Sequence, residues 1–153
     1  MNEDPMMTVR QATIADLDIL MSLFDAYRQF YDCQSDLSSA RSFLRHRFEH
    51  QQSIIMLALD GAKAVGFAQL FPSFSSTRLA RAFILNDLFV ATQARGTGAG
   101  RALLDAACAY GRSVGAARLS LSTAVTNATA QAVYERAGWT RDTQFCAYGI
   151  SLS

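Results

Sequence analysis

Three glycines at alternate positions, Gly96, Gly98 and Gly100, lie between an apolar stretch and an amphipathic one. A glycine has no Cβ, so a phosphate can approach the backbone closely at such positions. The amphipathic stretch has the apolar spacing of a helix. The first N–H groups of a helix have no intrahelical partner, and the helix dipole favours negative charge there. We therefore expect a phosphorylated cofactor to bind at this glycine-rich turn.

The apolar stretch before the glycines contains two polar residues, Asn86 and Asp87. Residues 82–90 otherwise have the composition of a strand that is covered on both faces, as in the middle of a mixed α/β sheet. A buried carboxylate is unfavourable unless it is paired or useful. Adjacent side chains of a strand point to opposite faces, so these two side chains would diverge unless a bulge re-aims one of them.

The remaining elements surround this strand, turn and helix. Apolar spacing and turn residues predict strands at 9–14, 54–59, 64–71, 118–123, 140–144 and 145–152, and helices at about 17–31, 39–50, 98–115 and 126–137. Thr13 and Asp16 have the spacing of a capping box at the start of the first helix. Asp60-Gly61 predicts a tight turn between two strands, and Phe74 lies in an expected loop at 72–77.

Length, charge and cysteine content limit the class of protein. The chain has 153 residues, a formal net charge of +1 at pH 7 and three cysteines. We expect residues 1–153 to form a single domain, with an ordered core at about 7–152. The small net charge argues against nucleic-acid and membrane partners, and no apolar run is long enough to span a bilayer. The N-terminus lacks the apolar core of a signal peptide, so we expect a cytoplasmic protein.

His46 and His50 are four residues apart, a spacing that metal ligands use. Arg45 and Arg47 flank them, and the glutamate of an H-E-x-x-H motif is missing. We interpret this segment as a solvated basic face and expect no metal site.

Phosphate-binding motifs differ in what accompanies their glycines. No Lys-Ser or Lys-Thr follows these glycines, as a Walker P-loop requires, and Arg101 stands where a Rossmann fingerprint has Gly or Ala. A mere connector would not need alternating glycines flanked by two arginines. Residues 95–100 resemble motif A of the GNAT superfamily of N-acetyltransferases, which is Arg or Gln, two residues of any type, Gly, one residue, then Gly or Ala.

Two further segments support the resemblance. Residues 86–90 look like the fourth strand of that superfamily, and residues 127–139, with Asn127, Ala130, Tyr134 and Gly138-Trp139, look like its motif B. The resemblance covers about residues 7–152 and is closest to the branch of histone and polyamine acetyltransferases. It implies an α/β (α+β) GNAT fold, with a central mixed, mostly antiparallel, twisted sheet of about six or seven strands and about four helices on both faces.

The resemblance also implies a cofactor, acetyl-CoA, and roles for residues. The backbone N–H groups from Arg95 to Arg101 would hold the pyrophosphate, the backbone of Leu88 and Val90 the pantetheine arm, and Tyr134 would give a proton to the departing thiolate. The candidate cofactor-binding residues are Leu88, Phe89, Val90, Arg95, Gly96, Thr97, Gly98, Ala99, Gly100, Arg101, Asn127, Ala130 and Tyr134.

The residue that handles the proton of the amine stays open. Many relatives have Glu at the position of Asn86, and an asparagine cannot act as a base. Either Asp87 is the base or an electrostatic anchor, or Asn86 orients a water or the amine while solvent takes the proton. A third alternative makes Asp87 a structural carboxylate held by backbone N–H groups. The candidate catalytic residues are Tyr134, Asp87 and Asn86, and the candidate substrate-binding residues are Tyr27, Tyr31, Phe74 and Tyr148.

The activity implied is transfer of an acetyl group from acetyl-CoA to a primary amine by direct attack in a ternary complex. The acceptor is a polyamine, an amino acid or a lysine or peptide amine. A polyamine site would need a cluster of carboxylates, but acidic residues and arginines balance one another along the first two helices. Relatives are commonly dimers, so we expect a homodimer. The alternative is a non-catalytic acyl-CoA-binding regulatory module, which Asn86 in place of glutamate keeps open.

Overall fold

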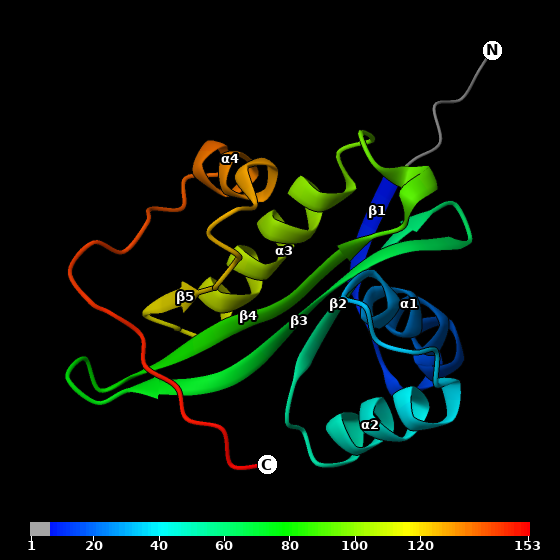
Figure 1. The fold of residues 1–153 in the computed structure, drawn as a ribbon, viewed down its shortest axis with the longest axis horizontal. Coiled ribbons are helices and arrows are strands. Elements are labelled where there is room, and N and C mark those ends of the chain that lie inside the picture. The colour runs from blue at the N-terminus through cyan, green and yellow to red at the C-terminus, as the bar shows by residue number, and fades with distance from the viewer. Residues whose placement is uncertain (1–6) are drawn as a thin grey trace. The chain divides into compact units, whose positions relative to one another are not determined.

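The computed structural model describes residues 7–153, which fall into two compact units (Figure 1). The first unit ends at Ser122, and the second comprises Thr123–Ser153. The elements of the first unit are β1 (Met7–Gln11), a 3-10 turn (Ile14–Asp16), α1 (Leu17–Phe30), α2 (Leu37–Glu49), β2 (Ile54–Asp60), β3 (Lys63–Ser75), β4 (Ala80–Val90), a second 3-10 turn (Thr92–Ala94), α3 (Ala99–Ser113) and β5 (Arg118–Ser120). The second unit contains α4 (Ala128–Arg136).

The first unit is built on a five-stranded sheet in the order β1-β2-β3-β4-β5. Neighbouring strands from β1 to β4 are antiparallel, and β5 is parallel to β4. The expected tight turn joins β2 to β3, and Gly61 has a φ of +59° there, a value that glycine adopts without strain. The mixed α/β fold class and the four helices therefore agree with the sequence analysis.

Helices cover both faces of the sheet, as Figure 1 shows for α1 and α2 on one face and α3 on the other. Phe67 of β3 packs against Phe24 and Tyr27 of α1, with ring centroids 6.1 and 5.7 Å apart. Its neighbour Gly66 faces α3, where a Cβ would lie 3.3 Å from Leu103 Cδ1. The alternation of β3 thus assigns one face to aromatic packing and the other to close contact with α3.

Strand β3 is longer than the sequence predicts, because residues 72–75 continue it where a loop was expected. Pro72 pairs with Phe83 of β4, whereas the pairing of β3 with β2 ends at Leu70. A proline is tolerated at this point because β3 has only one strand neighbour there and the missing N–H leaves no ladder bond unmade. Phe74 therefore lies on the far end of a strand.

The C-terminal segment corrects the expected strand count from about six or seven to five. Residues 140–144 and 145–152 form no strand in the described chain. Within this segment Asp142 Oδ1 accepts hydrogen bonds from the N–H groups of Gln144 and Phe145, and these bonds are local. Apolar composition favours a strand but does not supply the partner backbone that a strand needs.

No helix within residues 7–153 combines the length and the apolarity that a membrane crossing requires.

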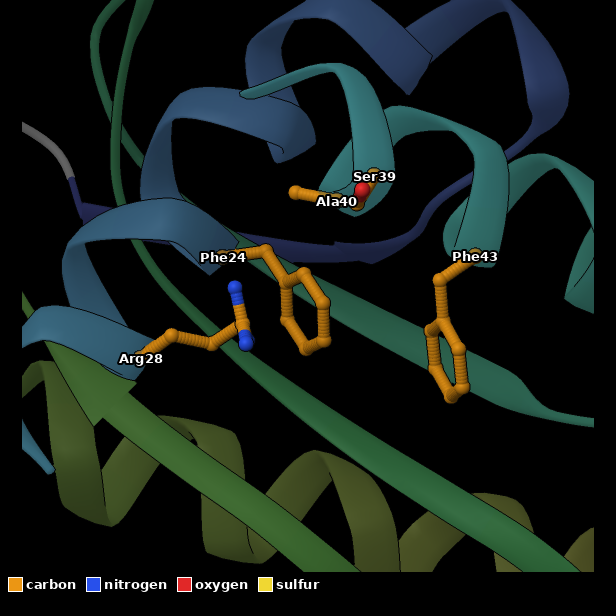
Figure 2. Close-up of a pocket in the computed structure, with 5 residues that line it drawn as sticks. All are labelled: Phe24, Arg28, Ser39, Ala40 and Phe43. Carbon is orange, nitrogen blue, oxygen red and sulfur yellow. The ribbon is translucent and has the colours of Figure 1, made fainter. Parts of the chain in front are cut away.

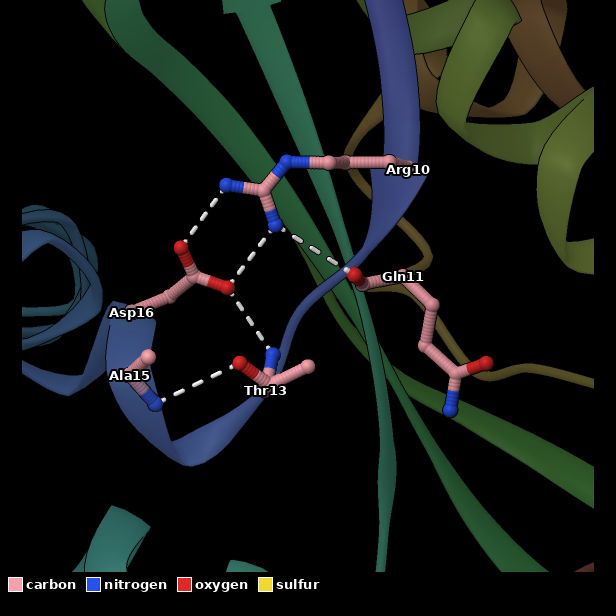
Figure 3. Close-up of polar contacts among 5 residues, drawn as sticks. All are labelled: Arg10, Gln11, Thr13, Ala15 and Asp16. Atoms are coloured by element: carbon pink, nitrogen blue, oxygen red, sulfur yellow. Dashed lines mark hydrogen bonds and ion pairs between the residues drawn. The ribbon is translucent and has the colours of Figure 1, made fainter.

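An ion pair fixes the connection from β1 to α1 (Figure 3). Arg10 donates through both terminal nitrogens to the carboxylate of the buried Asp16, at 2.7 and 2.8 Å. The same carboxylate accepts from Thr13 N, and Thr13 Oγ1 accepts from Ala15 N, which completes the predicted capping box. The hydrogen bonds from Arg10 lower the pKa of Asp16 from 3.8 to about 2.

We expect Asp16→Asn to lower the free energy of unfolding by about 2 kcal/mol at neutral pH, because the charged form is bonded in the folded state. The folded-state pKa lies below the unfolded one, so this contribution is complete above about pH 5 and is lost as the pH falls toward 2. Urea unfolding at several pH values measures it. Asp18→Asn, in an exposed pair with Arg41, is the control and should change the free energy by less than about 1 kcal/mol. Equal losses in both variants would contradict this account.

Candidate functional site

The turn between β4 and α3 has the backbone that its glycines predict. Gly96 and Gly98 have φ values of +80° and +87°, in the left-handed region that favours glycine. Gly98 is the N-cap of α3, and no side chain caps this helix. Neither glycine has an atom within 4 Å of the place where a Cβ would stand, so the space over the turn is open.

The same turn presents unpaired backbone donors. The first hydrogen bond of α3 runs from Ala102 N to Gly98 O, at 3.0 Å. The N–H groups of residues 96–100 donate to no acceptor within residues 7–153. Consecutive free N–H groups at a helix N-terminus suit an anion, and a pyrophosphate fits them better than a neutral group does.

Several side chains around the glycine turn already make hydrogen bonds or ion pairs within the protein. Arg95 Nε donates to Val90 O at 3.2 Å, and its guanidinium carbon lies 5.2 Å from the centroid of the Phe30 ring. The Thr97 hydroxyl donates to Ala94 O, and Arg101 pairs with Asp105 at 3.0 Å. Ala99 is buried and Gly100 half-buried, which places the start of α3 against the sheet. The two arginines thus add positive charge around the free N–H groups without occupying them.

Strand β4 has an open edge next to the turn. Strand β5 pairs with β4 only at Ala82–Ile84, so residues 85–90 have no strand neighbour on that side within the described chain. Ala91 N donates to Val65 O on β3, at 2.8 Å. Because the direction of backbone groups alternates along an antiparallel strand, Leu88 and Val90 direct theirs to the open edge. An extended ligand could bond to this edge as another strand would.

A β-bulge in β4 explains how the adjacent side chains of Asn86 and Asp87 lie side by side. Gln69 pairs with Asp87 while Leu70 pairs with Leu85, so Asn86 is the extra residue on β4. The bulge brings the two side chains together, and Asn86 Nδ2 donates to Asp87 Oδ1 at 3.1 Å. Asp87 lies opposite Gln69, on the face that Phe67 and Phe89 share with α1.

Gln69 is a polar residue that the sequence analysis did not assign to the site. Its Nε2 donates to Asp87 Oδ2 at 2.7 Å, and the side chain is 0% exposed. Its Oε1 accepts no hydrogen bond from the described residues, although buried acceptors are normally satisfied. The sequence signal for Gln69 was its alternation with Val65, Phe67 and Phe71, which places it on an apolar face.

The aromatic candidates separate into two groups. Tyr27 packs edge-on against Tyr31, Phe67 and Phe89, with ring centroids 5.1 to 5.9 Å apart, on the same face of the sheet as Asp87. The Phe89 side chain belongs to this cluster, and the alternation of β4 directs its backbone groups toward β3 and not to the open edge. Phe74 is 74% exposed and stands five residues beyond Gln69 along β3, about 16 Å away, so the structure does not bring it to Tyr27 and Tyr31.

The other candidates lie in the second unit. Asn127 is the N-cap of α4, and its Oδ1 accepts from Ala130 N at 3.1 Å. Tyr134 lies two residues before the end of α4, with its ring centroid 6.3 Å from that of Trp139. Tyr148 is 97% exposed on the C-terminal segment. The capping role of Asn127 occupies its oxygen and leaves its amide nitrogen available to a ligand.

We expect the Gln69–Asp87 contact to show strong non-additivity. Gln69→Leu leaves one oxygen of a buried carboxylate without its donor, so it should lower the free energy of unfolding by about 1–3 kcal/mol. Gln69→Leu with Asp87→Leu removes both partners and should cost less than the sum of the single changes. Denaturant unfolding of the four proteins measures the coupling. Additive changes would show that the two side chains do not depend on each other.

Comparisons with known proteins agree with this geometry. The acetyltransferase (GNAT) family model matches residues 19–139. The chain is 42% identical over 146 residues to YhfO of Bacillus subtilis, an uncharacterised N-acetyltransferase, with 95% of this chain and 98% of that protein covered. It is 37% identical over 83 residues to a probable acetyltransferase of Haemophilus influenzae, covering 54% of this chain and 57% of that protein. The crystal structure of a probable acetyltransferase superposes with a TM-score of 0.91 at 42% identity, covering 95% of this chain and 98% of the other.

Proposed function

Because the chain belongs to the acetyltransferase (GNAT) family, we propose that it transfers the acetyl group of acetyl-CoA to a primary amine by direct attack in a ternary complex. The observation that carries the proposal is the run of free N–H groups at residues 96–100, which continues into the open edge of β4. The acceptors open to the enzyme are polyamines, amino acids and lysine or peptide amines.

The residues of the first unit fit acetyl-CoA in two places. The free N–H groups of the glycine turn, with Arg95 and Arg101 beside them, would hold the pyrophosphate. The backbone of Leu88 and Val90 on the open edge would hold the pantetheine arm and turn an N–H toward the thioester oxygen. Bound acetyl-CoA supplies an activated acetyl group, and no nucleophilic side chain of the protein is needed.

Asp87 is the acidic group best placed to meet the acceptor amine. It stays bonded to the amides of Gln69 and Asn86, which fix the carboxylate and leave it acceptor capacity for an ammonium or a proton. Asn86, which cannot act as a base, serves in this proposal to orient Asp87. The phenol of Tyr134 would give a proton to the thiolate, a role that fits a group protonated at neutral pH.

The glycine turn gives a direct test of cofactor binding. Gly98→Ala puts a Cβ on a residue with a φ of +87° and should displace the free N–H groups, so we expect acetyl-CoA affinity to fall by roughly tenfold or more. Gly115→Ala, with a φ of +74° just after α3, is the matched control with a similar backbone cost. Isothermal titration calorimetry should show near-unchanged affinity for the control. Similar affinities in both variants would place the cofactor elsewhere.

The reaction itself is tested by thiol release from acetyl-CoA with a panel of polyamines, amino acids, lysine peptides and aminoglycosides. We expect acetylation of at least one amine, and a fall in kcat/KM of roughly 100-fold or more in Asp87→Asn, because an amide cannot accept the proton of the amine. Asp18→Asn, on the exposed start of α1, serves as the control.

Two outcomes would contradict parts of the proposal. Tight acetyl-CoA binding without transfer to any amine would favour the non-catalytic acyl-CoA-binding module. Transfer with an unchanged kcat/KM and pH profile in Asp87→Asn would make Asp87 a structural carboxylate, with the proton leaving through solvent.

A further inference from the structure

A cavity of about 230 Å³ lies between α1 and α2 and has no role in the site described so far. Figure 2 shows its lining, with Phe24 and Arg28 on α1 and Ser39, Ala40 and Phe43 on α2. The rings of Phe24 and Phe43 stack with centroids 5.7 Å apart and an interplanar angle of 9°. Cavities for drug-sized ligands measure about 300–1,000 Å³, so this one suits a group of amino-acid size.

Arg28 supplies the charge of this cavity. Its guanidinium group lies in the cavity beside the Phe24 ring in Figure 2. Within residues 7–153 its side chain makes no hydrogen bond and has no carboxylate oxygen within 4 Å. An arginine presents a planar fork of donors that matches a carboxylate, and a half-buried position strengthens such a bond.

Asp25 and Asp36 lie close enough to feel the charge of Arg28, but both take their hydrogen bonds from other groups. Asp25 accepts from Ser35 Oγ and Gln29 Nε2 at 2.6 and 2.9 Å, and from Asp36 N at 2.8 Å. Asp36 in turn accepts from Ser39 N as the N-cap of α2. These bonds tie the end of α1 to the start of α2, so the walls of the cavity are held in place while the donors of Arg28 stay available.

Phe24, which lines the cavity, packs on the same face of the sheet as Asp87. Phe24 contacts the rings of Tyr27 and Phe67, and Tyr27 contacts that of Phe89. Phe67 and Phe89 are two residues from Gln69 and Asp87 on their strands, so all four share one face of the sheet. An acceptor lying along this face could place its amine at Asp87 and its other end in the cavity.

We propose that this cavity selects acceptors that carry a carboxylate beside an apolar group, such as apolar amino acids or short peptides ending in one. The carboxylate pairs with Arg28, and the apolar group packs on Phe24 and Phe43. A polyamine would bring a second ammonium to the guanidinium, and this like-charge contact disfavours it. The inference rests on the proposed acetyl transfer and adds the class of its acceptor.

The first experiment compares acceptors that differ only in the carboxylate. Wild-type protein should acetylate phenylalanine with a higher kcat/KM than phenylalaninamide, by about 10- to 100-fold, as a charge-assisted bond provides. Arg28→Gln should remove this preference, and Arg28→Lys should restore part of it because the charge remains. Arg41→Gln, on the same helix pair but bonded to Asp18 outside the cavity, should keep it. Thermal unfolding of Arg28→Gln should stay close to wild type, because the Arg28 side chain makes no hydrogen bond or ion pair within residues 7–153.

A second experiment does not depend on catalysis. N-acetylphenylalanine should bind wild-type protein about 10-fold or more tighter than its amide, and Arg28→Gln should abolish the difference. Amines acetylated without preference for the carboxylate, or spermidine preferred to phenylalanine, would overturn this inference and leave the proposed transfer intact. Carboxylate-dependent binding without acetylation of any amine would support the cavity and contradict the transfer. Equal binding of acid and amide would overturn the inference whatever the activity.

Discussion

A carboxylate buried between two apolar strands needs donors, and Asp87 receives them from its cross-strand partner Gln69 and from its neighbour Asn86. The regular pairing of residues 66–69 with 87–90 places Asp87 opposite Gln69, and the bulge that follows places Asn86 beside Asp87. Removal of a donor from such a group is unfavourable, so the register of β3 and β4 and the position of the carboxylate depend on one another. The same register directs Phe67 and Phe89 toward α1, which builds the aromatic cluster beside Asp87.

Strand β4 therefore contributes both a face and an open edge to the candidate site. One face carries Asp87 and the aromatic rings, where an amine would be received. One edge, left open beyond Ile84, leads directly into the glycine turn and its unpaired N–H groups. Because the edge and the face belong to the same few residues, a ligand on the edge and an amine on the face would meet at the end of β4. The acetyl transfer proposed for this chain needs this juxtaposition.

The sequence predicted the parts of the fold that local pattern determines. The glycine turn, the capping box of Thr13 and Asp16 and the turn at Gly61 all have the expected conformation, because each rests on the chemistry of a few adjacent residues. From the sequence, a bulge at Asn86 was one possibility only, since the register of β4 depends on its pairing with β3. Alternation with Val65, Phe67 and Phe71 places Gln69 on an apolar face, but its pairing with Asp87 again depends on register. The strands expected in 140–152 are absent from the described chain. Apolar alternation within a segment does not show whether a sheet edge is available to pair with it.

The central claim is that acetyl-CoA lies along the edge of β4 and ends at the glycine turn. Backbone amide chemical shifts of isotopically labelled protein, followed by NMR as acetyl-CoA is added, test it most directly. The account predicts large shifts at Leu88, Val90 and residues 96–100, with small shifts at the β2–β3 turn around Gly61. Saturable binding that leaves the amides of 88–100 unchanged would contradict it.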